Sequence, residues 1–311
     1  MTRLLCATDL LPKSEFAVDR AGLLAEELGA DLSLLHVVSR VSSEGVPEQY
    51  LQIAIARMKS RMGPPLWRAG KAPDVAVRAG NPARLILDAI ALEEPDLLIV
   101  GPHGRRGLLD APEGTIAEKV VSSGQCPVLV VQERASAPYR NALLALDLEA
   151  GSGLALRAAE RLVLKDSAHG TVIHAREASH SAVLQGTASG SRGEATTAMR
   201  EFLEQESADS TRYELVVAEG NPVSTIMRAI GKHQPDLLVM GTRGDGRVRR
   251  AAIGSVANQL LKIAPCDVLI VPRGALEASA KPAAPRAISN RGQVTHSGRR
   301  RTGAVSARRP S

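Results

Sequence analysis

Aromatic residues, cysteines and long apolar runs are all scarce in this chain, and each shortage excludes a class of protein. Phe, Trp and Tyr together make up 2% of the 311 residues, too few to build the platforms on which proteins stack single-stranded nucleic acid. The three cysteines, Cys6, Cys126 and Cys266, lie far apart and form no CxxC pair. This spacing argues against a zinc site or a disulfide framework and for a reducing compartment, so we expect buried thiols.

The longest apolar runs are of strand length, so the sequence predicts no transmembrane helix. The N-terminal segment lacks the apolar core of a signal peptide because Asp9 and Lys13 interrupt it. Hydrophobic residues make up 44% of the chain and charged residues 23%, as in ordinary globular proteins. We expect a cytoplasmic protein with an aliphatic core, which suits strands covered by helices.

The net charge of +6 is concentrated at the C-terminal end. Residues 273–311 carry nine Lys or Arg and one acid, Glu277, which sum to +8 and leave −2 for residues 1–272. This segment is rich in Ala, Ser, Pro, Gly and Arg, so we expect a disordered basic tail. Contact of the tail with nucleic acid or an anionic membrane is one alternative, and a passive, solubilising extension is the interpretation we favour.

The chain contains an internal repeat. A shift of 140 residues aligns residues 80–131 with residues 220–271 without gaps, and 19 of the 52 aligned positions are identical. The period is far too long for a solenoid, so the repeat indicates duplication of a whole domain. We expect a first domain at 1–132, a linker at 133–139, a second domain at 140–272 and the tail at 273–311.

Each repeat alternates apolar strands with amphipathic helices, which predicts an α/β fold with parallel sheets covered on both faces. In the first repeat we expect strands at 3–8, 31–38, 74–80, 96–101 and 127–131, and helices at 14–29, 48–68, 81–94 and from 114. In the second we expect strands at 141–146, 170–175, 214–220, 236–241 and 267–271, and helices at 152–165, 196–206, 221–233 and 254–263. Residues 178–193 are small and polar, which predicts a mobile loop.

Both repeats carry one glycine pattern, placed after a strand at the edge where doubly wound sheets bind ligands. The pattern G-x2-G-x9-G-[S/T] occurs as Gly101, Gly104, Gly114 and Thr115, and again as Gly241, Gly244, Gly254 and Ser255. We expect the first two glycines to let the backbone turn tightly and approach a ligand. The last glycine opens a helix, whose N-terminal N–H groups favour phosphate.

On these residues the chain resembles a tandem member of the universal stress protein family over about residues 1–272. The resemblance implies two domains, each with a five-stranded parallel sheet in the order 3-2-1-4-5. It also implies that members with the glycine motif bind ATP, with or without Mg²⁺. In the family, final strands commonly pair between domains. Residues 128–131 and 268–271 would then pair within one chain as a pseudo-dimer, and a homodimer of two chains is the alternative.

The resemblance also implies the roles of individual residues. The motif contacts the phosphates and ribose, an Asp ending the first strand lies near the adenine and ribose, and an apolar residue ending the second strand backs the adenine. The candidate nucleotide-binding residues are Asp9, Val37, Gly101, Gly104, Gly114 and Thr115 in the first repeat, and Asp147, Ala175, Gly241, Gly244, Arg247, Gly254, Ser255 and Val256 in the second.

The two repeats differ in the charge of the loop inside the motif. With His counted as neutral, residues 102–113 sum to zero and residues 242–253 to +3. Asp110 and Glu113 place negative charge in the first loop, and Pro112 removes an N–H donor. We therefore expect the second repeat to be the better nucleotide site, and the first to be weak or to need a divalent cation.

The first-strand turns also depart from the family. Members often carry a serine two residues after the aspartate, which Leu11 and Glu149 replace here. The serine five residues after it is present in both repeats, as Ser14 and Ser152.

Structural explanations exist for the same residues. The glycines could serve only as turns, Asp9 and Asp147 as helix caps, and the loop arginines, Arg247 among them, as a solvated face. His36 and His174 end the two second strands, and we expect them to be packed rather than catalytic.

No residue is assigned to catalysis. The sequence has no Ser-His-Asp arrangement, metal cluster or Walker lysine, and G-x-G-x-x-G is absent after the first strands. The leading hypothesis is a cytoplasmic stress-response protein that binds ATP and acts as a nucleotide-dependent regulator, with at most slow hydrolysis. The alternative is an interaction scaffold that does not use nucleotide.

Overall fold

In the computed structural model, the described residues are 1–39, 48–61, 72–102, 114–165, 168–176, 188–206, 208–242 and 253–275. The strands of the first half are β1 (Arg3–Thr8), β2 (Asp31–Val38), β3 (Asp74–Ala79), β4 (Leu97–Val100) and β5 (Val128–Val130). Its helices are α1 (Glu15–Leu28), α2 (Glu48–Arg61), α3 (Pro82–Glu93) and α4 (Ile116–Ser123).

The second half repeats this order of elements. Its strands are β6 (Asn141–Ala145), β7 (His169–Arg176), β8 (Tyr213–Glu219), β9 (Leu237–Gly241) and β10 (Asp267–Val271). Its helices are α5 (Ala150–Leu162), α7 (Ala188–Gln205), α8 (Pro222–His233) and α9 (Ser255–Ile263), with a short 3₁₀ turn at Ser210–Arg212.

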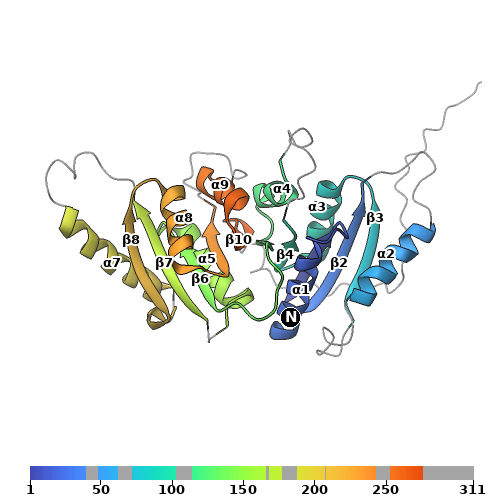
Figure 1. Cartoon of the computed structure of the whole chain (residues 1–311), viewed down its shortest axis with the longest axis horizontal. Coiled ribbons are helices and arrows are strands. Elements are labelled where there is room, and N and C mark those ends of the chain that lie inside the picture. Colours follow the sequence, from blue (N-terminus) through green and yellow to red (C-terminus); the bar gives the residue numbers. More distant parts are fainter. Residues whose placement is uncertain are drawn as a thin grey trace, which may run out of the picture.

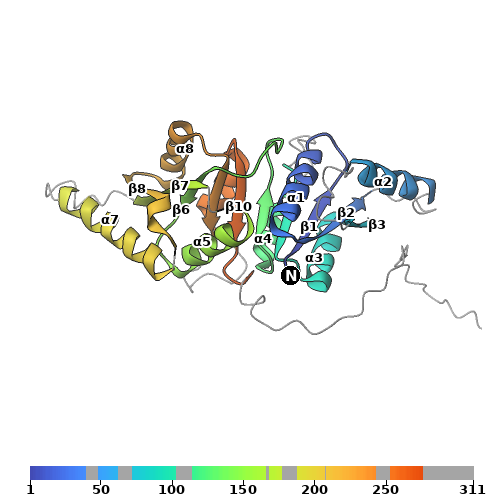
Figure 2. The same ribbon diagram turned by 90° about the horizontal axis from the view of Figure 1, so that it is seen from below.

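All ten strands form one sheet in the order β3-β2-β1-β4-β5-β10-β9-β6-β7-β8 (Figure 1). Pairing is parallel within each half, and the halves meet where β5 and β10 pair antiparallel, with Leu129 opposite Leu269. Of the two arrangements expected for the final strands, the structure therefore contains the intramolecular one. Figure 2 shows the result, an elongated molecule with α7 near one end and α2 near the other.

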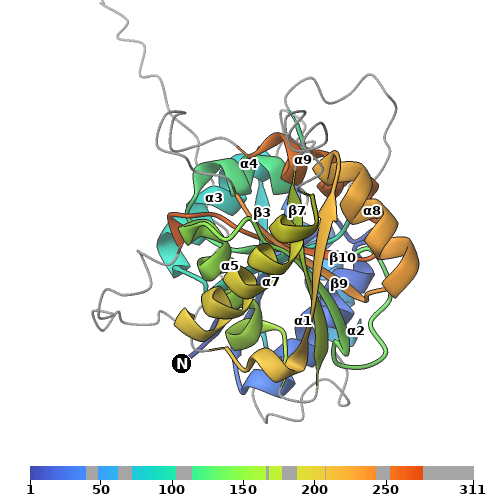
Figure 3. The same ribbon diagram turned by 90° about the vertical axis from the view of Figure 1, so that its left-hand side faces the viewer.

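Helices cover both faces of this sheet, which confirms the predicted fold class. One core layer unites α1, α2, α5 and α7 with one face, and the other unites α3, α4, α8 and α9 with the opposite face. Figure 3 shows α7 and α8 on opposite sides of the strands at one end. The four-residue strand β4 is buried throughout, as expected for a strand between two helical layers.

The three cysteines are free and buried, as expected. Burial raises the pKa of Cys6 to about 12, so its thiol stays protonated at neutral pH. Among the described residues, no helix has the length and apolar character needed to cross a membrane.

The start of one helix was misplaced in the sequence analysis. Helix α7 begins at Ala188, inside the predicted loop at 178–193, and eight residues before the predicted start. Extending an existing helix costs far less free energy than nucleating a new one. Small residues of modest helix propensity can therefore extend α7 at its N-terminal end, because its later turns pack against the core. Residues 178–187 lie outside the described part.

The helix C-terminus at Gln234 offers a test of backbone strain. Gln234 is exposed and has φ 46°, in the left-handed region that disfavours a side chain. Gln234→Gly should therefore raise the free energy of unfolding by about 1 kcal/mol, measured by urea denaturation. The converse control is Gly29→Ala, at φ 58° with no atom within 4 Å of the added Cβ, which should lower it by a similar amount. Equal stability of all three proteins would contradict this account.

Candidate functional site

The turn after β6 is built around Asp147. Its Oδ1 accepts hydrogen bonds from the Ser152 hydroxyl (2.6 Å) and from the N–H of Glu149 (3.1 Å). The Ser152 Oγ in turn accepts from the N–H of Asp147 at 2.9 Å. These reciprocal bonds fix the aspartate at the end of its strand and explain the spacing of five residues between Asp and Ser.

The first half builds the same turn. Asp9 Oδ1 accepts from the Ser14 hydroxyl (2.5 Å) and from the N–H of Leu11 (2.9 Å). Helices α1 and α5 have Ser14 and Glu149 as their N-caps, so the interpretation of Asp9 and Asp147 as helix caps is wrong. Both carboxylates instead organise the turn between strand and helix, as Asp side chains do in short loops.

The first motif glycines serve packing between strand and helix. A Cβ on Gly241 would lie 2.8 Å from the carbonyl oxygen of Gly151, and a Cβ on Gly101 would lie 2.7 Å from the Cα of Ser14. Both partners are backbone atoms at the start of α5 and α1, which cannot move aside as a flexible side chain can. The close approach expected of these glycines is therefore made to the protein's own helix.

The two motif helices begin differently. In α4, Thr115 and Glu118 form a capping box, in which Thr115 Oγ1 accepts from the Glu118 N–H (3.0 Å) and Glu118 Oε2 accepts from the Thr115 N–H (2.5 Å). In α9, the N-cap is Gly254, with no side-chain cap. The position that matches Glu118 is Asn258, so no carboxylate lies at the start of α9.

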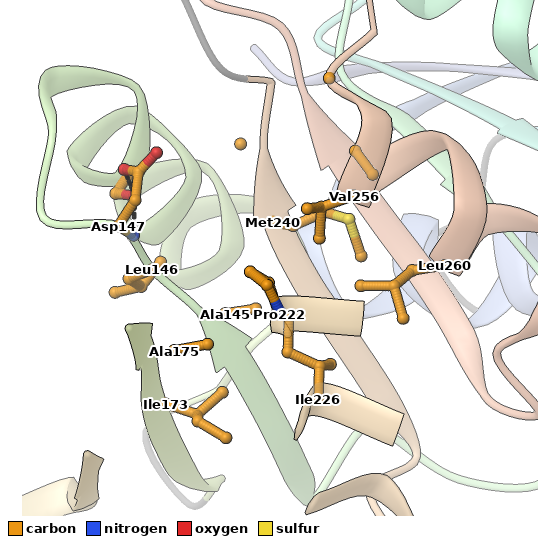
Figure 4. A pocket seen from close by; sticks show the side chains of 14 residues that line it. Ala145, Leu146, Asp147, Ile173, Ala175, Pro222, Ile226, Met240, Val256 and Leu260 are labelled. Atoms are coloured by element: carbon orange, nitrogen blue, oxygen red, sulfur yellow. Dashed lines mark hydrogen bonds between the residues drawn. The ribbon is translucent and has the colours of Figure 1, made fainter. Parts of the chain in front are cut away.

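An open cleft lies at this edge of the second half, with about 610 Å³ of space including its mouth. Asp147, Ser152, Gly241 and Gly254 line it, and the rest of its wall is apolar, with Asp147 at one end of the labelled side chains (Figure 4). The apolar lining consists of Ala145, Leu146, Ile173, Ala175, Pro222, Ile226, Met240, Val256, Ala257 and Leu260. Few polar groups at the rim of an apolar cleft are typical of a small-molecule site.

Five predicted residues of the second repeat meet in this cleft: Asp147, Ala175, Gly241, Gly254 and Val256. Ser255 is exposed at the start of α9, next to two of these lining residues. Gly244 and Arg247 lie outside the described residues, as does Gly104 in the first repeat.

The first-repeat residues occupy matching places in the fold. Asp9 follows β1, Val37 is the last residue but one of β2, Gly101 follows β4, and Gly114 and Thr115 precede α4. Their association with a ligand stays a prediction.

Sequence reasoning missed most of the apolar wall. Ile173 lies two residues before Ala175 on β7, and therefore on the same face of the sheet. Ile226 follows Pro222 by one helical turn of α8, and Leu260 follows Val256 in the same way on α9. These periodicities were visible in the sequence, but only the fold shows that the three elements converge.

The two histidines are packed, as expected. His36 Nδ1 lies 2.9 Å from the carbonyl oxygen of Thr8, and His174 Nδ1 lies 2.9 Å from that of Leu146. Each therefore ties the second strand to the residue just before the site aspartate. Within the described ranges, no group of three or more His, Cys, Asp or Glu could hold a metal ion.

The hydrogen bonds of Glu118 predict that its contribution to the stability of the fold depends on pH. Burial would raise the pKa of Glu118, but hydrogen bonds from Lys262 and Thr115 hold it below its ordinary value. A lowered pKa stabilises the fold above the unfolded pKa, and this contribution is lost as the pH falls through the folded pKa. Glu118→Gln should therefore cost about 1 kcal/mol at neutral pH, with the difference closing in acid. Urea denaturation across pH measures this, and a constant difference down to the lowest pH would contradict it.

Comparison with known proteins identifies the family. The model of the universal stress protein family matches residues 1–132 and again residues 138–272. The universal stress protein YxiE of Bacillus subtilis is 33% identical over 145 residues, which are 42% of this chain and 98% of that protein. A universal stress protein A-like protein of Arabidopsis thaliana is 34% identical over 67 residues, 22% of this chain and 38% of that protein.

Solved structures share the two-domain fold. A universal stress protein from Archaeoglobus fulgidus superposes with a TM-score of 0.65 at 19% identity, covering 88% of this chain and 96% of that one. A functionally unknown protein from Pseudomonas aeruginosa superposes with a TM-score of 0.62 at 20% identity, covering 87% and 92%. With two matches to the family model and the same fold, the chain belongs to the universal stress protein family as a tandem member.

Proposed function

We propose that this protein binds an adenine nucleotide, ATP, in the cleft of its second half and acts in the cytoplasm as a nucleotide-dependent stress regulator. The observation that carries the proposal is the cleft itself. Asp147, Gly241, Gly254 and Val256 come from three separate parts of the second half, and all four line this cleft. Family resemblance supplied these residues as candidates, and their convergence supports a shared ligand.

The start of α9 suits the phosphates. Helix N-termini offer N–H groups and the positive end of the helix dipole. Gly254 leaves room for an anion to approach, and the Ser255 hydroxyl at the first position of α9 can donate a further hydrogen bond. The loop before it, residues 242–253, adds a net charge of +3, which strengthens attraction for a polyphosphate.

The apolar wall suits the base. Ala175 on β7 and Met240 on β9 line the cleft together with Ile173, and these side chains offer a nucleobase an apolar surface. Asp147 stands at the rim above this wall (Figure 4), where a carboxylate can accept hydrogen bonds from ribose hydroxyls. Mg²⁺ would be bound through the phosphates rather than by a dedicated set of protein ligands.

We infer that the first half is the weaker site. Its loop, residues 102–113, has no net charge, and Glu118 adds a carboxylate at the start of α4. The Thr115 Oγ1 accepts the Glu118 N–H, and both the hydroxyl and the N–H of Thr115 hydrogen-bond to the Glu118 carboxylate. The first half therefore differs both in charge and in the donors left for a ligand, because Glu118 occupies the Thr115 N–H and Pro112 has no N–H.

The test is thermal unfolding in ATP. A ligand at a hundred times its Kd stabilises the folded state by about 2.7 kcal/mol, which a melting curve resolves. ATP should raise the melting temperature, and a parallel melt in GTP reports how far the shift depends on the base. Ser255→Ala should reduce the shift without changing the melting temperature of the free protein. No shift with either nucleotide would replace this proposal by a nucleotide-independent scaffold.

The basic tail calls for a separate truncation. Gly274 packs against the carbonyl oxygen of Gly124, and Ala275 is buried, so the cut belongs after Ala275 rather than after residue 272. ATP binding should survive this truncation. Any binding of nucleic acid or anionic vesicles should be lost in the truncated protein. In the full-length chain, such binding should weaken steeply as the salt concentration rises.

A further inference from the structure

The contact between the halves has an approximate twofold symmetry, because β5 and β10 pair antiparallel as equivalent strands. Each contact across this interface therefore has a mate in which the two halves exchange roles. The repeat assigns the mates: α1 matches α5 at a shift of 138 residues, and the strands β5 and β10 match at 140. Contacts that lack a chemically equivalent mate distinguish one half from the other.

Arg20 and Asp267 form one such contact. Arg20 on α1 reaches across to Asp267 on β10, with Nε and Oδ2 separated by 3.5 Å, and both side chains are less than a tenth exposed. Arg20 also stacks on the ring of Tyr139 at 3.8 Å and donates to the carbonyl oxygen of Ala137. The mates of the charged pair are Ala158 and Pro127, and neither carries a charge.

The linker completes the environment of Asp267. Its Oδ1 accepts from the backbone N–H groups of Gln132 (2.7 Å) and Glu133 (3.2 Å), and its Oδ2 accepts from the Tyr139 hydroxyl (2.6 Å). All three donors belong to the segment that connects the halves. The buried carboxylate is therefore satisfied only when the first half and its linker lie against β10.

A second charged contact across the interface also has no charged equivalent when the two halves exchange roles. Lys262 on α9 pairs with Glu118 on α4 at 2.8 Å. The mate of Lys262 is Ser122 and the mate of Glu118 is Asn258. Neither mate carries a charge, so this ion pair also forms only between unlike halves.

We propose that these two contacts make the interface selective. The first half pairs with the second half, and neither half pairs with another copy of itself. Two first halves would bury two Arg20 side chains against Pro127. Two second halves would bury two Asp267 carboxylates against Ala158. Buried charges without partners strongly destabilise an interface, so the partner that fits each half is the other half of the same chain. Arg20 and Asp267 are not among the residues that line the cleft, so their contact can be tested independently of nucleotide binding.

The test reverses one charge. Arg20→Asp places a carboxylate against Asp267 and should open the β5–β10 contact, because every pairing of the halves then buries a charge without a partner. The melting temperature should fall below that of the wild type, and size-exclusion chromatography with light scattering should show a larger hydrodynamic radius, because only the linker then joins the halves. The matched control is Arg161→Asp, which reverses the cross-half pair of Arg161, 44% exposed, with Asp96, 15% exposed, and should keep the hydrodynamic radius of the wild type. An Arg20→Asp variant with the hydrodynamic radius and melting temperature of this control would overturn the proposal.

A double-mutant cycle decides the matter if Arg20→Asp does not fold. Arg20→Met and Asp267→Asn each leave one buried charge without its partner, whereas the double variant removes both charges together. Asp267→Asn raises the unfolding equilibrium constant, and the factor of this rise should be at least about tenfold smaller in the Arg20→Met background. If the losses of unfolding free energy in the two single variants added up to the loss in the double variant, the two charges would not be coupled. This result would overturn the proposed selectivity of the interface.

Discussion

Gly254→Val should lower the affinity for ATP by about a hundredfold or more, equivalent to about 2.7 kcal/mol of binding free energy. Gly254 is the N-cap of α9 and lines the cleft, so an isopropyl group there would block anions from the helix N-terminus. Its φ of −58° suits any residue, and the substitution should leave the free energy of unfolding nearly unchanged. Titration calorimetry with ATP measures the affinity.

The control is the same substitution elsewhere in the same half. Gly231 lies on α8, and a Cβ added there meets no atom within 4 Å, so Gly231→Val should bind ATP like the wild type. Gly114→Val is a poorer comparison because Gly114 has φ 80° and its Cβ would lie 2.9 Å from Glu118 Oε2, so it should destabilise the fold directly. Wild-type affinity in Gly254→Val would rule out the start of α9 as the phosphate site.

Gly241→Ala should lower the free energy of unfolding by about 1–3 kcal/mol with no ligand present. The added Cβ would lie 2.8 Å from the Gly151 oxygen and 3.1 Å from its carbonyl carbon, so β9 and the start of α5 must separate. Guanidinium denaturation measures the loss. Gly231→Ala, in open space on a helix, should be neutral or stabilising, and a Gly241→Ala variant as stable as this control would refute the packing role.

The two glycine variants separate structure from binding within one motif. Gly241 is expected to act on stability through Gly151, whereas Gly254 is expected to act on affinity. A family motif read from the sequence gives both residues the same weight. Their different surroundings emerge only from the packing of α5 against the end of β9.

The fold was largely predictable because buried parallel strands and helix signals are local. The strands at 3–8, 31–38 and 267–271 were placed at their observed bounds, and Asn81 and Asn221 cap α3 and α8 with their side chains. These signals depend on periodicity and on capping residues that any single stretch of sequence displays.

The site was less predictable because it depends on convergence. Asp147, Gly241 and Gly254 could be named from a motif, whereas Pro222, Ile226 and Leu260 line the cleft only because α8 and α9 pack side by side. The role of Asp267 was hidden for the same reason. Its partners Arg20 and Tyr139 lie more than a hundred residues away in the sequence, and no local pattern connects them.

The most direct test of the nucleotide site is to denature freshly purified protein and identify adenine nucleotides in the supernatant by chromatography. The proposal predicts ATP or ADP from the wild type and from Gly231→Val, and none from Gly254→Val. If the wild type released no nucleotide and bound none on titration, the central claim would be contradicted, and the conserved geometry of the two halves would serve packing alone.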